Sequence, residues 1–394
     1  MVSITGFTAH VGVIHQISST IKKHNPDIFV IVGGSHALFK PEDYFNAEIN
    51  VIAATDDIMI FPNLIENKNS IENLKDISGL YLHINNQWFY TGKSECIASL
   101  DTLPFPNRKL TQRYRDKYRW YFHNKVATVW GSVGCPHRCY FCTQWIKTNG
   151  KFIARSPQSL VDEIEKIEEE LVFIADDNTF ADVKRAEEIY RLIKERGIKK
   201  KFIGYCSPKI AAVNSELIAK WAEIGLVQVV VGFESIREKD LMDIKNKSSL
   251  EIAEKAVGVF RKNKVDVMAS FIIYPDFSVE DFKALRKYVS KNKLFYSEYT
   301  PLTPFPGSLL MEQTKNDITT TEPALYDMQH IVLPTKITLK EFYKQMAKTY
   351  LYSHSPINAF RAKLTLRISF NPFSKTMLSY FKFLYNLRRA YLHH

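Results

Sequence analysis

The chain has 394 residues, of which 45% are hydrophobic and 24% charged, a composition typical of a globular protein with two or three domains. It contains no run of 18 or more apolar residues, no basic leader and only five cysteines, which argues against a transmembrane helix, a signal peptide and a disulfide scaffold. The net charge of +11 is concentrated in residues 355–394, which contain seven basic residues and no acidic one. Because the rest of the chain is nearly neutral, we expect a cytoplasmic protein that does not bind nucleic acid.

Residues 1–62 are predicted to form a partial Rossmann-like α/β unit. A helical pattern covers 11–23, and the short apolar segments that read as strands are 2–6, 29–34 and 50–53. Parallel strands place ligands beyond their carboxyl ends, where Gly33, Gly34, Ser35 and His36 follow the second strand. The alternative is that the glycine pair only makes a turn and that His36 is structural. So few strands and helices cannot cover both faces of a sheet, so we expect this unit to be incomplete.

Residues 63–125 are predicted to be a connector. It contains a hairpin around Asn85-Asn86, followed by the stiff extended segment 103–107.

Residues 126–310 alternate between strand and helix signals, which predicts a parallel sheet with right-handed crossovers, either open or curled into a partial (β/α)6 barrel. The predicted strands are 126–132, 171–175, 201–205, 227–233, 266–273 and 294–299, and the predicted helices are 157–170, 182–197, 214–224, 249–263 and 279–291. Residues 311–394 are predicted to be a C-terminal extension that ends in a helical, basic and aromatic tail.

A cysteine motif follows the first strand of this array. Cys135, Cys139 and Cys142 have the spacing C-x3-C-x2-C. Thiolates are soft ligands that select zinc, copper(I) or iron–sulfur clusters, and a structural zinc site is closed by four protein ligands. A zinc knuckle with His137 as the fourth ligand is therefore one alternative. The other is a [4Fe-4S] cluster on three thiolates, which leaves one iron open for an outside ligand.

The motif, with Phe141 as its aromatic residue, resembles the radical S-adenosylmethionine superfamily. The segments NPDIFVIVGGSHA, LDTLPFPNR, VFIADDNTF, VGFES and TPFPGS resemble the subgroup with an N-terminal cobalamin-binding domain, to which hopanoid methylases belong. In that subgroup the cobalamin domain begins with strands that this chain lacks, and its usual acidic turn is here Ala54-Thr55-Asp56-Asp57, so a truncated cobalamin domain is expected. The resemblance implies a [4Fe-4S] cluster, S-adenosylmethionine, cobalamin, an external electron donor and methyl transfer to an unactivated carbon.

The resemblance also implies site residues. Those expected near S-adenosylmethionine are Phe141, Asp176, Asp177, Ser207, Glu234 and Ser235, and those expected near cobalamin are Thr5, Gly33, Gly34, Ser35 and His36. Helix capping is the alternative role for Asp176, Asp177, Glu234 and Ser235.

The function expected from this resemblance is cleavage of S-adenosylmethionine to a 5′-deoxyadenosyl radical, followed by cobalamin-dependent methylation of a small hydrophobic substrate. The alternatives are a cobalamin-independent radical rearrangement or oxidation, and a non-catalytic metal-binding protein. Segment 374–392 mixes aromatic and basic residues, which is typical either of an interfacial helix at the inner membrane face or of a final helix packed on the core.

Overall fold

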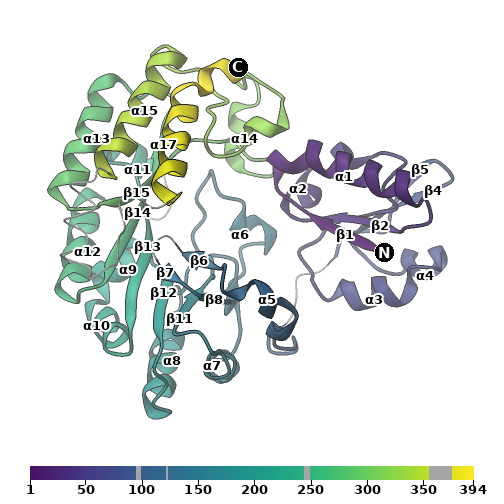
Figure 1. The fold of residues 1–394 in the computed structure, drawn as a ribbon, viewed down its shortest axis with the longest axis horizontal. Coiled ribbons are helices and arrows are strands. Elements are labelled where there is room, and N and C mark those ends of the chain that lie inside the picture. The colour runs from purple at the N-terminus through teal and green to yellow at the C-terminus, as the bar shows by residue number, and fades with distance from the viewer. Residues whose placement is uncertain (95–98, 121–122, 244–248, 355–374) are drawn as a thin grey trace. The chain divides into compact units, whose positions relative to one another are not determined.

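The computed structural model describes residues 1–394 except 95–98, 121–122, 244–248 and 355–374 (Figure 1). Cys96 and part of the basic tail therefore lie outside the described residues. The chain forms two compact units. The first comprises Met1–Ala98, Tyr140–Asn149 and Thr303–Pro334, and the second comprises Ser99–Cys139, Gly150–Leu302 and Thr335–His394.

The first unit contains a five-stranded sheet in the order β1-β2-β3-β4-β5. Its strands are β1 (Val2–Thr5), β2 (Val30–Gly33), β3 (Val51–Ala53), β4 (Leu80–Ile84) and β5 (Gln87–Tyr90). The first three are parallel, as predicted, whereas β4 and β5 are antiparallel. Asn85 and Asn86 both have positive φ, as a type I′ turn requires, and they join the antiparallel strands β4 and β5, so the predicted hairpin is confirmed. Instead of standing apart in a connector, the hairpin extends the sheet.

Both faces of this sheet are covered, although residues 1–62 were expected to have too few strands and helices to cover them. Side chains alternate along a strand, so Val30 and Val32 pack with α1 (Val11–His24) while Ile31 packs on the other face with α3 (Ile60–Asn67). Helix α3 and its neighbour α4 (Ile71–Lys75) were not predicted. The other helices of this unit are α2 (Ser35–Phe39), α6 (Gln144–Lys147), α14 (Leu309–Thr314) and the 3-10 turns η1 (Thr8–His10), η2 (Pro41–Tyr44) and η4 (Pro323–Leu325).

The second unit is built on a six-stranded sheet in the order β15-β14-β13-β12-β11-β8, and every neighbouring pair is parallel. The strands are β8 (Val126–Val129), β11 (Leu171–Ile174), β12 (Lys201–Tyr205), β13 (Leu226–Glu234), β14 (Asp266–Ile273) and β15 (Tyr296–Pro301). The outermost strands β8 and β15 do not pair with each other, so the predicted partial barrel is confirmed as an open one.

Helices lie outside this curved sheet (Figure 1). They are α7 (Pro157–Glu165), α8 (Val183–Glu195), α9 (Pro208–Val213), α10 (Ser215–Glu223), α11 (Glu238–Asp243), α12 (Leu250–Lys262) and α13 (Val279–Lys291). Ser156 caps α7, with its side chain accepting from the Ser159 N–H. Helix α9 was not predicted. The shorter elements of the unit are η3 (Arg108–Thr111), α5 (Gln112–Arg115), β6 (Arg119–Trp120), β7 (His123–Asn124), β9 (Ser132–Val133) and β10 (Ile153–Ala154).

The C-terminal part of the second unit contains α15 (Leu339–Ser353), α17 (Lys375–Arg388) and η5 (Ala390–His393). Helix α17 packs on α15 with Leu384 and Leu387 buried and with the rings of Phe383 and Tyr350 5.2 Å apart. Among the described residues, no helix combines the length and the apolar character needed to cross a membrane.

Candidate active site

The cysteine motif lies in the loop at the C-terminal end of β8, the edge of the sheet where this type of fold carries out its chemistry. After β9 the chain turns at Gly134, whose φ of +79° suits glycine, and then reaches Cys135. Cys135, Cys139 and Cys142 are partly exposed, reduced thiols. Burial raises the pKa of the Cys135 thiol, while hydrogen bonds with the backbone of His137 and the side chain of Asn178 oppose this shift.

The donor chemistry of this loop fits an iron–sulfur cluster. Among the residues that the structure describes, no three His, Cys, Asp or Glu side chains converge on a single metal ion. Thiolates of a cluster bind different irons and so need not converge on one point. Among the residues with a described placement, none forms a hydrogen bond with the buried Nε2 atom of His137 or Oδ1 atom of Asn178, so two buried polar atoms near this loop are unsatisfied.

Asp176 and Asp177, which follow β11, hold the start of the cysteine loop. Oδ1 of the buried Asp176 accepts the N–H groups of Gly131 and Ser132 at 2.6 and 2.9 Å. Asp177 accepts the N–H of Gly134 at 2.9 Å. Neither aspartate caps α8, because the N-cap is Asp182. Burial raises the pKa of Asp176, and its two backbone bonds and the Arg185 charge oppose that shift.

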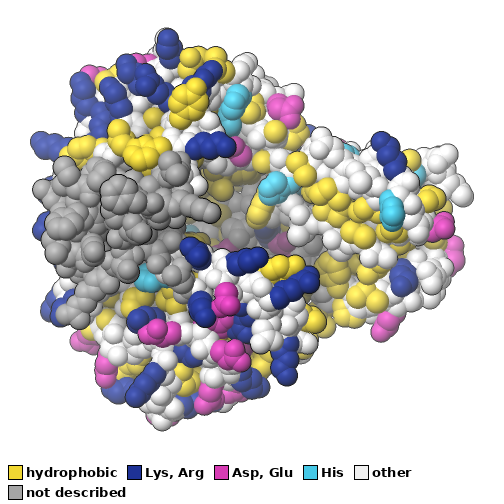
Figure 2. Space-filling view, in the orientation of Figure 1, with side chains coloured by type: hydrophobic (Ala, Val, Ile, Leu, Met, Phe, Trp, Pro, Cys, Tyr) yellow, Lys and Arg dark blue, Asp and Glu magenta, His cyan; other side chains and the backbone are white. Residues whose placement is uncertain are grey.

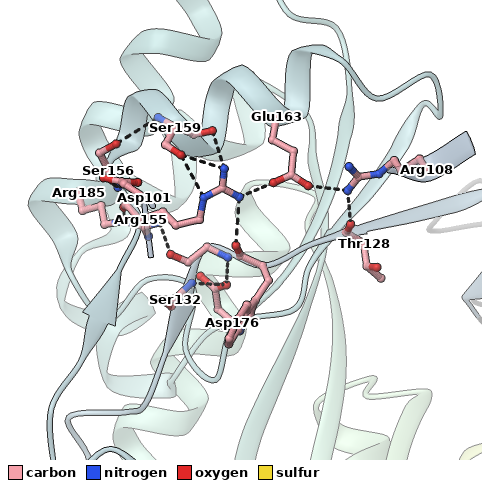
Figure 3. A network of polar contacts seen from close by, with 12 residues as sticks. Asp101, Arg108, Thr128, Ser132, Arg155, Ser156, Ser159, Glu163, Asp176 and Arg185 are labelled. Atoms are coloured by element: carbon pink, nitrogen blue, oxygen red, sulfur yellow. Dashed lines mark hydrogen bonds and ion pairs between the residues drawn. The ribbon is translucent and has the colours of Figure 1, made fainter. Parts of the chain in front are cut away.

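A buried ionic network supports the same loop (Figure 3). The Arg185 guanidinium donates to the carbonyls of Gly131 and Arg155, both at 2.9 Å. Arg155 forms an ion pair with Glu163, whose other oxygen is 2.7 Å from Arg108. Arg108 also donates to the carbonyl of Thr128 in β8, so the network fastens the strand on which the loop is built.

The sequence analysis did not predict this ionic network. One signal was available, since Glu163 stands among the apolar positions of α7 that face the core. A carboxylate at such a position needs a cationic partner, but the pattern does not show which arginine supplies it.

Glu234 ends β13 in a strained conformation. The strand has an irregularity between Gly232 and Glu234, and φ at Glu234 is +64°, in the left-handed region. The Glu234 carboxylate lies over Gly232, where a larger side chain would collide with it. Burial raises the pKa of Glu234 to about 7. A strained carboxyl with a raised pKa at a strand end is typical of a functional site.

Ser235 and Ser207, also expected near S-adenosylmethionine, have hydrogen-bond partners within the protein. The Ser235 hydroxyl donates to Asp240 at 2.5 Å, and Asp240 forms an ion pair with Arg237 at 2.7 Å. Arg237 also pairs with Asp276 at 2.6 Å, so it joins the loops after β13 and β14. Ser207 caps α9 by accepting from the Ile210 N–H at 3.3 Å. Their roles at a cofactor remain predictions, although each has a structural role here.

The residues expected near cobalamin lie together in the first unit. Gly34 has a φ of +100°, and a Cβ there would be 2.6 Å from the Thr5 hydroxyl, so close packing of the two strand ends requires glycine. Ser35 accepts from the Lys147 ammonium at 2.6 Å. His36 is buried, with Nδ1 3.1 Å from the Thr8 hydroxyl and Nε2 2.9 Å from Asp43. Burial lowers the pKa of His36, while Asp43 opposes the shift.

A cavity of about 400 Å³ adjoins His36 within the first unit. Its lining includes Thr8, Phe39, Asp43, Pro306, Gly307 and Met311. Pro306 and Gly307 of the segment TPFPGS thus contribute to this cavity. Phe141, expected near S-adenosylmethionine, is partly exposed and meets Tyr140 edge to face at 5.5 Å.

Comparisons with known proteins bear on this site. The family model described as Radical SAM superfamily matches residues 131–289. The chain is similar to the hopanoid C-3 methylase of Methylococcus capsulatus, with 26% identity over 348 residues that cover 87% of this chain and 66% of the relative.

Two solved structures are also similar. OxsB, described as a cobalamin-dependent S-adenosylmethionine radical enzyme, has a TM-score of 0.72 at 13% identity, covering 99% of this chain and 63% of its own. TsrM from Kitasatospora setae, described as a radical S-adenosylmethionine methyltransferase, has a TM-score of 0.68 at 17% identity, covering 90% and 78%. At such identities the structural likeness shows the fold alone. The chain spans slightly less than two thirds of the length of the hopanoid methylase and of OxsB.

Proposed function

From the radical S-adenosylmethionine domain that this chain carries, we propose that it is an enzyme that cleaves S-adenosylmethionine and methylates a carbon atom of a hydrophobic small molecule. The observation that carries the proposal is the C-x3-C-x2-C loop at the C-terminal end of β8, held through its backbone by Asp176 and Asp177. The likeness to a protein named hopanoid C-3 methylase supports methylation as the outcome.

Cys135, Cys139 and Cys142 hold a [4Fe-4S] cluster in this proposal. When bound, that group supplies one electron for reductive cleavage of S-adenosylmethionine to a 5′-deoxyadenosyl radical, and an external donor restores the electron. The protein itself orients and shields these cofactors. Asp176 and Asp177 fix the backbone of the cysteine loop. The Glu234 carboxyl has no hydrogen-bond partner among the described residues, and in this proposal it accepts a hydrogen bond from a polar group of S-adenosylmethionine.

Cobalamin is proposed to bind at the carboxyl ends of β1 and β2, near Thr5, Gly33, Gly34, Ser35 and His36. The cavity beside His36 supports this placement. Both ring nitrogens of His36 already have partners, so His36 would form part of the wall rather than bind cobalt. Methyl transfer is the chemistry that this group would supply.

The proposal also includes a cytoplasmic location with a peripheral membrane contact through residues 374–392. Helix α17 supports the contact because Phe381 and Tyr385 are exposed on its outer side while its other side packs on α15.

The test is anaerobic purification followed by addition of S-adenosylmethionine and dithionite. We expect iron, a broad visible charge-transfer band and release of 5′-deoxyadenosine. The variant with Cys135→Ala, Cys139→Ala and Cys142→Ala should lose all three signals. Cys206→Ala, which removes the buried thiol outside the motif, should keep them.

Other outcomes point to the alternatives. Zinc without iron would favour a non-catalytic metal-binding protein. Release of 5′-deoxyadenosine by protein that retains no corrin absorbance after incubation with hydroxocobalamin would favour a cobalamin-independent reaction.

A further inference from the structure

Helices α13, α15 and α17 form one layer at the surface of the second unit (Figure 1). Arg286 on α13 donates to the Thr349 hydroxyl on α15 at 3.0 Å, and the Phe282 and Phe342 rings meet edge to face at 5.6 Å. Tyr350 on α15 meets Phe383 on α17 in the same way at 5.2 Å. The outer sides of the three helices are therefore parts of one surface, here called the α13–α15–α17 face.

A basic pocket lies on this face. Its volume is about 450 Å³, and it is lined by Lys283, Arg286, Lys287, Ser290, Lys291 and Tyr352, with no acidic residue among them. Lys283 and Lys291 have carboxylate partners outside the pocket, Glu280 at 3.5 Å and Glu254 at 2.7 Å.

Arg286 has no carboxylate partner in the part of the chain that the structure describes. It is half-buried, and among the described residues its only hydrogen bond is to a neutral hydroxyl. Burial lowers the pKa of Arg286, and no carboxylate opposes that shift. A guanidinium that is partly removed from water without a counter-charge, beside an ammonium and two hydroxyl groups, suits a phosphate group.

Exposed apolar side chains also lie on α15 and α17. Leu351 and Tyr352 on α15 are 46% and 43% exposed, and Phe381 and Tyr385 on α17 are 50% and 59% exposed. Basic side chains are interspersed with hydrophobic ones over this part of the surface (Figure 2). The sequences of α15 and α17 contain one acidic residue, Glu341.

We propose that the α13–α15–α17 face docks on an anionic membrane and that its basic pocket binds a lipid phosphate. The inference rests on the membrane contact proposed above and extends it from α17 to α13 and α15. A soluble anion would need only the cations. Exposed aromatic and aliphatic side chains among the cations match a membrane interface, where rings lie at the level of the headgroups.

The experiment is co-sedimentation of the full chain with vesicles of phosphatidylcholine alone or with one third phosphatidylglycerol. We expect binding to the anionic vesicles only, and weaker binding at high salt because ions screen the attraction. Arg286→Gln combined with Lys287→Gln should weaken binding roughly tenfold. Phe381→Ser combined with Tyr385→Ser should also weaken it, although no charge is lost.

The matched control is Lys194→Gln combined with Lys220→Gln, which removes the same charge from α8 and α10 and should leave binding unchanged. Equal binding to neutral vesicles, or equal loss in the control and the pocket variant, would overturn the proposal. So would binding of inorganic phosphate or RNA by a protein that ignores anionic vesicles. Release of 5′-deoxyadenosine is measured without vesicles, so failure of docking and failure of the proposed catalysis are separate results.

Discussion

The Asp176 side chain connects the end of β11 to the backbone at the start of the cysteine loop. Its carboxylate accepts two N–H groups of the cysteine loop from a buried position. Asp176→Ala leaves both donors unsatisfied, which costs about 1–3 kcal/mol for each buried group. We expect this variant to have a lower melting temperature and less iron per chain.

The control for that variant is Asp116→Ala, because Asp116 is exposed and forms an ion pair with Lys125 at the surface. An Asp176→Ala protein with full iron content and unchanged melting temperature would show that the loop keeps its shape without this carboxylate.

The raised pKa of Glu234 predicts that the stability of the folded protein depends on pH. Its pKa of about 7 is above the ordinary value, so between about pH 4.5 and 7 the folded protein holds a proton that the unfolded chain has released. Stability contributed by the protonated carboxyl is therefore present at low pH and lost as pH rises through this range, by about 2 kcal/mol after allowing for solvent screening.

Glu234→Gln should remove this dependence. The measurement is urea unfolding of cofactor-free protein from pH 5 to pH 8, with Glu216→Gln on the exposed side of α10 as the control. Parallel pH profiles for the wild type and Glu234→Gln would contradict the prediction.

Two glycines, Gly34 and Gly258, differ in how much space their helices and strands leave for a side chain. At Gly34, between β2 and α2, a Cβ would meet the Thr5 hydroxyl at 2.6 Å and the Gly6 carbonyl at 2.7 Å, and φ is positive. Gly34→Ala should therefore lower the free energy of unfolding by about 2 kcal/mol or more. Gly258 lies inside α12 with nothing near its Cβ position, so Gly258→Ala should raise it by about 1 kcal/mol.

Chemical denaturation of the two variants compares them directly. If Gly34→Ala were as stable as the wild type, β1 and the β2–α2 turn would have to move apart easily. That result would weaken the case for a preformed binding edge in the first unit.

For the whole molecule, we expect the two sheets to supply the stability and propose that the cysteine loop supplies the chemistry. Val172, Ile203, Val229, Val231 and Ala269 are almost fully buried in the second unit and require no metal. Removing the proposed cluster with a chelator should therefore leave the far-ultraviolet circular dichroism and a cooperative thermal transition in place. Loss of both would mean that metal binding and folding are coupled, as in small zinc-binding domains.

The sequence alone predicted the parallel core and the cysteine site. Strands 201–205 and 266–273 are mostly apolar and residues 279–291 have a helical pattern, so all three elements were predicted with the bounds that the structure shows. These signals are local, because each depends on side chains a few positions apart. The C-x3-C-x2-C motif is local for the same reason.

Tertiary structure decided how the other residues are used. Asp176 and Gly131 are 45 positions apart, and Arg108 and Glu163 are 55 apart, so no periodicity links them. The second covered face of the first sheet, the strain at Glu234 and the basic pocket beside Tyr352 likewise depend on segments brought together by folding. A pattern specifies which side chains are buried, whereas their partners are set by the packing of distant segments.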